Sequence, residues 1–163
     1  MSVTRCSFEP KRKWTNMSVK AGVLAGSTYP ADEYRNAKTG KMVPDARGGM
    51  PTAVIAAALN YGSGQRVARP FMNLTALEQG KSWTRALRTF LKDGMSTSGA
   101  FATIGQIMKE DIQHTISTWP GDNSAEWSAI KGFDHGLLQT SHLLNSIAFE
   151  VKGGQPGGEA TAS

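Results

Sequence analysis

The stretch that decides the fold is "GAFATIGQIMKEDIQHTISTW", Gly99 to Trp119. Apolar residues recur in it three or four positions apart, which is the spacing of one face of an α-helix. No other part of the chain is as regularly periodic, so we predict a long amphipathic helix here. The apolar stripe consists of Phe101, Ile104, Met108, Ile112, Ile116 and Trp119.

A second long helix is predicted just before the first, from about Pro70 to Lys92. Pro70 suits the start of a helix, because its fixed φ is helical and no backbone donor is needed there. Phe71, which follows it, is predicted to close the end of the core. Only the short break "DGMSTSG" separates the two helices, which favours an antiparallel hairpin. A shorter helix is predicted within Pro51 to Gly64. The stripe of the Pro70–Lys92 helix consists of Met72, Ala76, Trp83, Leu87 and Phe90, widened by Leu91.

Two strands are predicted at opposite ends of the chain. One lies in "MSVKAGVLAG", Met17 to Gly26, and the other in "SIAFEV", Ser146 to Val151, where apolar side chains alternate with others. A helical turn is predicted just before the second strand. The strands can bury their apolar faces only by pairing in one sheet that the helices cover. We therefore predict an α+β fold over residues 17–152, with a mainly antiparallel sheet covered by a long two-helix hairpin.

Several segments lie outside this regular structure. Residues 1–16 are predicted to be a basic arm, and residues 153–163 a flexible tail. Ser27 to Pro51 is rich in Gly, Pro and charge and forms a long excursion loop, with a loose hairpin around Thr39–Gly40. Pro120 to Gly136 is also predicted to be a loop. A long excursion in a compact domain usually has a function, so we expect it to contact another subunit or component.

The net charge of +5 is unevenly distributed. Residues 1–20 carry five basic groups against one acid, and residues 51–100 carry six against two, so each part has a charge of +4. Residues 101–150 carry two basic groups against six acids, a charge of −4. This distribution fits contact with nucleic acid through the basic part. It also fits self-association of basic with acidic parts, or simply solvated surface.

Signals of catalysis and cofactor binding are weak. His135 and His142 are seven positions apart with no third ligand at a recognisable spacing, and His114 is expected at the surface. Neighbouring acids such as Asp32 and Glu33 point apart and do not form an acid/base pair. We predict no enzymatic activity, no catalytic residue, no metal site and no cofactor. The absence of a signal-type or membrane-spanning apolar run predicts synthesis in a cytoplasm and no membrane partner.

Several segments together resemble one protein family. "AALNYGSG", Ala57 to Gly64, and "VARPFMNLTAL", Val67 to Leu77, are similar to a short helix and an Ala-Arg-Pro-Phe motif opening a long helix in neck proteins of tailed phages. "AFATIGQIMKEDIQHTI", Ala100 to Ile116, resembles the second helix of that family. "WSAIKGFDHGLLQTSHLLNSIAFEV", Trp127 to Val151, resembles its C-terminal signature, and "VKAGVLAGSTYP", Val19 to Pro30, resembles its first strand.

The family is that of the tail-completion, or head–tail joining, proteins, related to the phage Mu virion-morphogenesis proteins. The resemblance implies a non-enzymatic structural virion protein that forms a homo-oligomeric ring, a hexamer by analogy, in the phage neck. The ring would assemble in the cytoplasm of the host bacterium, and genomic DNA would pass through its lumen. It would meet a head-completion or connector protein on one side and the tail terminator or tail tube protein on the other. Gln139 and Ser141 stand where the family often has Asp and Gly.

Two alternatives stay open. A tail terminator protein has a similar fold and place in the virion. A basic nucleic-acid-binding domain would instead use residues 5–20 together with Arg66, Arg69, Arg85 and Arg88. Arg69 projects beside the positive end of a helix dipole, which is unfavourable unless an acid or phosphate neutralises it. A neighbouring subunit or a local salt bridge could supply that partner. The predicted intersubunit or neck-partner contacts are Arg66, Arg69, Phe71, Tyr34, Lys11, Arg12 and Lys13.

Overall fold

The computed structural model describes residues 17–64, 67–137, 141–153 and 161–162. Its main sheet pairs β1 (Ser18–Val23) antiparallel with β4 (Ile147–Lys152), with Ala21 opposite Phe149. The predicted pairing of these two strands is therefore confirmed. β5 (Thr161–Ala162) pairs antiparallel with β4 on its other edge.

The segments predicted at the two ends of the chain are only partly within the described residues. The basic arm, residues 1–16, lies outside them, as do residues 154–160 and 163 of the predicted flexible tail. Thr161 and Ala162 also belong to that tail, and they differ from the prediction because their backbone pairs with β4.

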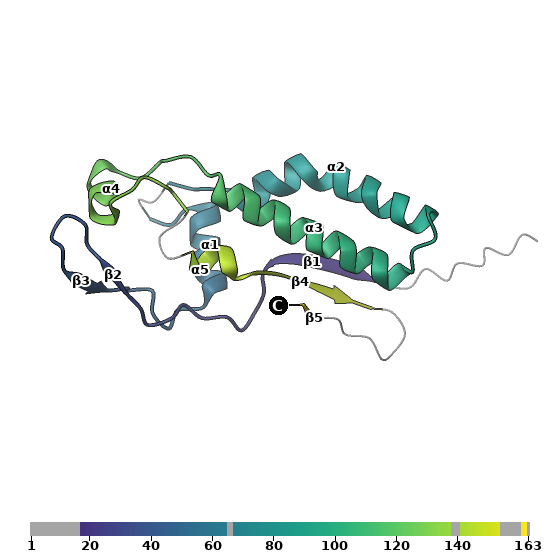
Figure 1. The fold of residues 1–163 in the computed structure, drawn as a ribbon, viewed down its shortest axis with the longest axis horizontal. Helices are drawn as coiled ribbons and strands as arrows, with labels where there is room; N and C mark the ends of the chain where they lie inside the picture. The colour runs from purple at the N-terminus through teal and green to yellow at the C-terminus, as the bar shows by residue number, and fades with distance from the viewer. Residues whose placement is uncertain (1–16, 65–66, 138–140, 154–160, 163) are drawn as a thin grey trace, which may run out of the picture.

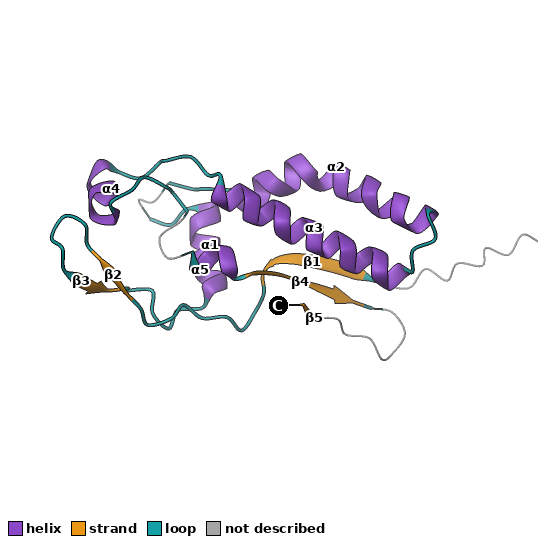
Figure 2. Cartoon of the chain, in the orientation of Figure 1, coloured by secondary structure: helices purple, strands orange, loops and turns teal. Residues whose placement is uncertain are grey.

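Three helices follow one another in the middle of the chain: α1 (Thr52–Tyr61), α2 (Phe71–Lys92) and α3 (Thr97–Ser117). α2 and α3 form the predicted hairpin, and α3 lies between α2 on one side and β1 and β4 on the other (Figures 1 and 2). The hairpin covers the sheet through α3, and α2 forms an outer layer. No helix in the described part of the chain combines the length and the apolar composition needed to cross a bilayer.

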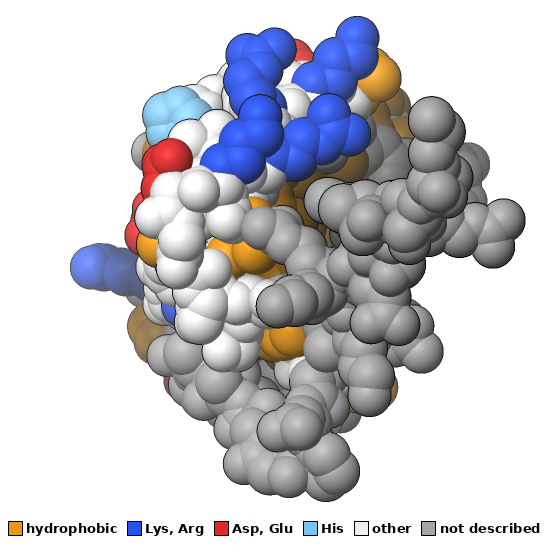
Figure 3. All heavy atoms as spheres, turned by 90° about the vertical axis from the view of Figure 1, so that its right-hand side faces the viewer, with side chains coloured by type: hydrophobic (Ala, Val, Ile, Leu, Met, Phe, Trp, Pro, Cys, Tyr) orange, Lys and Arg blue, Asp and Glu red, His pale blue; other side chains and the backbone are white. Residues whose placement is uncertain are grey.

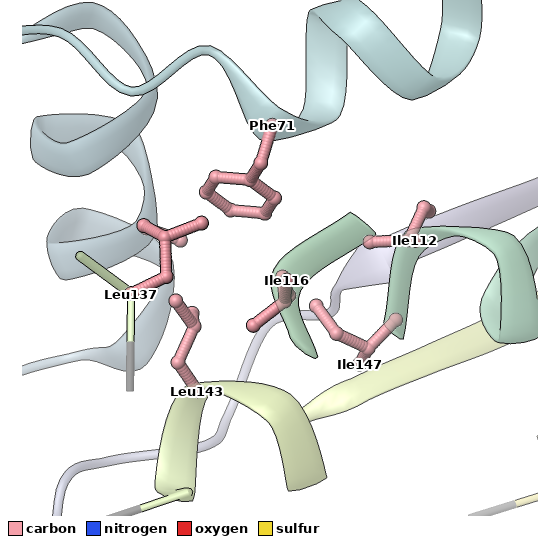
Figure 4. Packing of buried hydrophobic residues seen from close by; sticks show 7 residues of the cluster. Phe71, Ile112, Ile116, Leu137, Leu143 and Ile147 are labelled. Carbon is pink, nitrogen blue, oxygen red and sulfur yellow. The ribbon is translucent and has the colours of Figure 1, made fainter. Parts of the chain in front are cut away.

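The core lies where the start of α2 meets the end of α3. Figure 4 shows Phe71 of α2 facing Ile116 of α3, with Leu143 on the opposite side from Phe71 and Ile147 of β4 beside them. Phe71 and Ile116 are fully buried. Phe71 therefore closes the end of the core, as the sequence predicted.

The buried stripe of α2 differs from the predicted one. Thr75 is buried, whereas Ala76, which the prediction placed in the stripe, is exposed. The hydroxyl of Thr75 lies 2.7 Å from the carbonyl oxygen of Phe71 and 2.7 Å from the hydroxyl of Thr115. The predicted stripe contained only apolar residues and so left out Thr75. A threonine can be buried when its hydroxyl is hydrogen-bonded inside the protein.

The excursion forms a hairpin of β2 (Glu33–Arg35) and β3 (Met42–Pro44), which confirms the turn predicted around Thr39–Gly40. The side-chain oxygen of Asn36 accepts hydrogen bonds from the backbone N–H groups of Lys38 and Thr39. The turn ends at Gly40, whose φ of 68° lies in the left-handed region.

The prediction of a loop over Pro120 to Gly136 is wrong in its middle. α4 (Ala125–Lys131) forms there because the Ser124 side chain accepts a hydrogen bond from Trp127 N, and Gly132 ends the helix with a φ of 81°. These cap signals were present in the sequence, but the helix is too short to show an apolar period. α5 (His142–Asn145) is the helical turn that the sequence predicted before β4.

Candidate interaction surfaces

The start of α2 is fixed by residues from α1. The side-chain oxygen of Asn60 accepts a hydrogen bond from Met72 N at 3.0 Å, and Arg69 N donates to the carbonyl of Leu59 at 2.7 Å. Asn60 is 3% exposed. Pro70 provides no side-chain cap for α2. Asn60, which belongs to α1, therefore provides part of the capping. The sequence prediction missed this residue, although an asparagine near the end of an otherwise apolar helix was visible in the sequence.

Arg69 has a partner within the chain. Its Nε lies 2.8 Å from both carboxylate oxygens of Asp122, in the segment after α3. Trp119 Nε1 also donates to Asp122, at 3.1 Å. Burial raises the pKa of Asp122, but the hydrogen bonds from Arg69 and Trp119 outweigh it, so the net pKa lies below its ordinary value. Of the two partners considered for Arg69, the structure has the local salt bridge.

The same region holds further polar contacts. Asn123 donates to the Asp134 carboxylate from its backbone and its side chain. Lys131 Nζ donates to the backbone carbonyl of His135 at 2.6 Å. Burial, followed by the charge of nearby Arg69, lowers the pKa of Lys131. Together with the Arg69–Asp122 pair, these contacts tie the segments before and after α4 to the start of α2.

A second cluster forms at the base of the excursion. The Arg47 guanidinium lies over the Tyr29 ring, 4.8 Å from its centroid, and donates two hydrogen bonds to the Asp45 carboxylate. The His142 ring meets Tyr29 edge to face at 4.7 Å. The hydrogen bond from Arg47 lowers the pKa of Asp45, whereas burial raises the pKa of Tyr29. The base of the excursion is therefore part of the domain's own packing, which the sequence prediction did not foresee.

The outer part of the excursion contacts α4. Tyr34 of β2 packs edge to face on Trp127, with ring centroids 6.2 Å apart, and Ala37 N donates to the carbonyl of Ile130. Tyr34 is half-buried. A contact between Tyr34 and another subunit stays a prediction, and only its remaining exposed surface could make it.

The other predicted contact residues fall into two groups. Phe71 is fully buried and cannot touch a neighbouring subunit, so its prediction as an intersubunit contact is wrong. It is wrong because the side chain closes the core instead of pointing outward. Arg66, Lys11, Arg12 and Lys13 lie outside the described residues.

Large apolar side chains are exposed on α1, on the segment after it and on the first turns of α2. Val54 and Tyr61 lie seven positions apart on one face of α1, and Tyr61 is 70% exposed. Leu74 and Leu77 share a face of α2, where Leu77 is 80% exposed. Single exposed apolar residues are common, but a group of them in neighbouring elements is typical of an interaction site. Val67, between the two helices, is 78% exposed.

The outer face of α2 becomes basic after Leu77. Figure 3, which views the molecule from the side where α2 ends, shows Lys and Arg side chains gathered along its top. All four basic residues of α2 are exposed, and within the described part of the chain none has an ion pair or side-chain hydrogen bond. These residues, named the α2 basic face from here on, are Lys81, Arg85, Arg88 and Lys92.

Metal-binding geometry is absent from the part of the chain that the structure describes, where no three His, Cys, Asp or Glu side chains come together. His114 is exposed, as predicted. His135 and His142 instead have separate structural contacts, through Ser117 O for the first and Tyr29 for the second.

Comparisons of the chain with protein-family models, with curated proteins and with solved structures found no match. The resemblance to phage neck proteins therefore remains a prediction from the sequence motifs.

Proposed function

We propose that the chain is a structural protein of the tailed-phage neck, acting in tail completion or head–tail joining without enzymatic activity. It would form a homo-oligomeric ring around the path of the genomic DNA. One side of the ring would meet a head-completion or connector protein, and the other the tail terminator or tail tube.

The observation that supports self-association is the exposed apolar surface of α1, of the segment after it and of the first turns of α2. Tyr61, Val67 and Leu77 are each at least 70% exposed and lie next to the Ala-Arg-Pro-Phe segment. Burying apolar surface of this kind drives most protein association, at about 25 cal/mol per Å². A second copy of the chain is the occupant that the neck proposal requires.

The backbone at Ser141 is compatible with the family resemblance. Its φ is 57°, in the left-handed region where residues other than glycine are uncommon. The family often has glycine at the matching position. A left-handed backbone is one that glycine adopts easily, so the conformation of Ser141 is compatible with a glycine at this position in the family that the sequence resembles.

The proposal is tested by replacing apolar side chains on this surface. Tyr61→Ser with Leu77→Ser should leave a folded monomer, because both side chains are exposed, and should abolish ring formation in sedimentation and electron microscopy. Met95→Ser is the control, since Met95 is 41% exposed in the connection between α2 and α3, away from α1 and the first turns of α2. A wild-type chain that stays monomeric at high concentration, and is absent from purified virions by mass spectrometry, would count against the proposal.

A further inference from the structure

The α2 basic face has a regular geometry. Its members follow one another at intervals of four, three and four residues on α2. At 3.6 residues per turn they fall within an arc of about 60°, over a rise of about 16 Å. The buried residues of α2, Phe71 and Thr75, point instead toward the core and α3. The basic residues therefore form one straight outward ridge.

The positive charge of this ridge exceeds the negative charge of the acids beside it, four cations against two acids. Glu78 is the one acid within α2, and Asp93 follows its last residue. Neither forms an ion pair with the ridge in the part of the chain that the structure describes. The four unpaired cations repel one another because they lie close together. An anion bound to the ridge would relieve this repulsion, so the ridge favours an anionic ligand.

A second copy of the chain offers a poor acidic counterpart. Five of the six acids between residues 101 and 150 already have a hydrogen-bond or ion-pair partner inside the chain, and for two of them, Asp122 and Glu150, that partner is a cation. These pairs are Gln106 with Glu110, Trp83 with Asp111, Arg69 with Asp122, Asn123 with Asp134, and Lys152 with Glu150. The acids are also spread over α3, the segments around α4 and β4. The basic part of one copy facing the acidic part of the next is therefore disfavoured at this ridge.

We propose that the α2 basic face binds the phosphate backbone of nucleic acid without sequence specificity. Lysine and arginine contact phosphates through charge-assisted hydrogen bonds, and closely spaced phosphates provide the row of negative charge that the ridge lacks. No hydrogen bond or ion pair within the described residues orients the ridge side chains toward base edges, so we assign the contact to the phosphate backbone. The inference does not depend on the neck proposal, because a monomer would present the same ridge.

The test measures binding of the purified full-length chain to a short random-sequence DNA duplex by fluorescence anisotropy. The ridge variant is Lys81→Gln, Arg85→Gln, Arg88→Gln and Lys92→Gln together. Glutamine has nearly the same helix propensity as lysine and arginine, so circular dichroism should be unchanged. The control variant removes the same charge from exposed residues elsewhere, through Lys20→Gln, Arg35→Gln, Lys38→Gln and Lys41→Gln.

We expect the ridge variant to bind at least about tenfold more weakly at low salt and to lower the slope of log K against log salt by about 3 to 4. The control should keep most of the wild-type slope. Equal losses in both variants would overturn the proposal, as would a loss found only in Lys11→Gln, Arg12→Gln and Lys13→Gln. Ridge-dependent binding to poly-glutamate but not to DNA would assign the ridge to an acidic protein instead. Sedimentation of the ridge variant shows whether it still self-associates, so that a loss of DNA binding can be distinguished from a loss of ring assembly.

Discussion

α2 and α3 are adjacent helices of 22 and 21 residues, yet they are covered to very different extents. α3 buries Ile104, Ile112 and Ile116 among others, because α2 packs on one of its sides and the sheet on the other. α2 buries only Phe71 and Thr75, both in its first two turns. An apolar period therefore predicts that a helix forms and which side faces inward, but not how many layers cover it.

The largest expected difference between the helices concerns core packing. Ile116→Ala should lower the free energy of unfolding by about 2–5 kcal/mol, because the cavity it leaves lies between Phe71 and Leu143. Leu77→Ala on the exposed face of α2 should change it by less than about 0.5 kcal/mol. Urea unfolding of the monomer measures both. Similar losses in the two variants would mean that the outer face of α2 is covered.

Two glycines, one in each helix, test whether α3 is packed more closely than α2. A Cβ on Gly105 of α3 would lie 2.2 Å from Cδ2 of Phe149, so Gly105→Ala should cost about 1–3 kcal/mol through overpacking. A Cβ on Gly80 of α2 would meet nothing within 4 Å. Gly80→Ala should therefore stabilise the protein by about 0.5–1 kcal/mol through helix propensity. Thermal unfolding should show shifts of opposite sign, and a stabilising Gly105→Ala would contradict the close packing of α3 on β4.

The smallest expected effect concerns the ion pair that joins the start of α2 to the segment after α3. The pKa of Asp122 is lowered, so its ionised form contributes stability that is fully present above the ordinary value of 3.8 and is lost as the pH falls through the folded pKa. Asp122→Asn should cost about 1 kcal/mol at neutral pH, since the pair is partly exposed. It should also flatten the loss of stability below pH 3.8.

The control for this ion pair is Glu126→Gln, because Glu126 is exposed and has no partner in the described part of the chain. Denaturant unfolding across the acid range compares the two variants. An Asp122→Asn protein whose stability falls with acid as steeply as that of the wild type would show that Arg69 does not act through this carboxylate.

Much of the fold could be predicted because periodic elements carry their signal locally. The apolar stripe of α3, Pro70 at the start of α2 and the alternation of Ile147 and Phe149 each reflect the geometry of one element. α4 was missed because seven residues cannot show a helical period. Thr75 was missed because its partners, the Phe71 carbonyl and Thr115, become neighbours only through helix formation and packing.

The candidate surfaces were less predictable than the fold. The charge of residues 51–100 was visible in the sequence, but Arg69 is bound to Asp122, whereas Arg85 and Arg88 remain exposed and unpaired in the described structure. Residues 69 and 122 are 53 positions apart, so no local pattern could pair them. Phe71 was predicted both to close the core and to contact a subunit, and its burial excludes the contact.

By itself, the sequence determined the types of the long elements, the hairpin and the α+β class, because backbone geometry imposes the periods of helices and strands on the chain. Only the tertiary structure decided which charges are neutralised and which apolar side chains stay exposed. Those outcomes depend on distances between elements, and they give α2 an outer face with an apolar first part, around Leu77, and a basic second part that begins at Lys81.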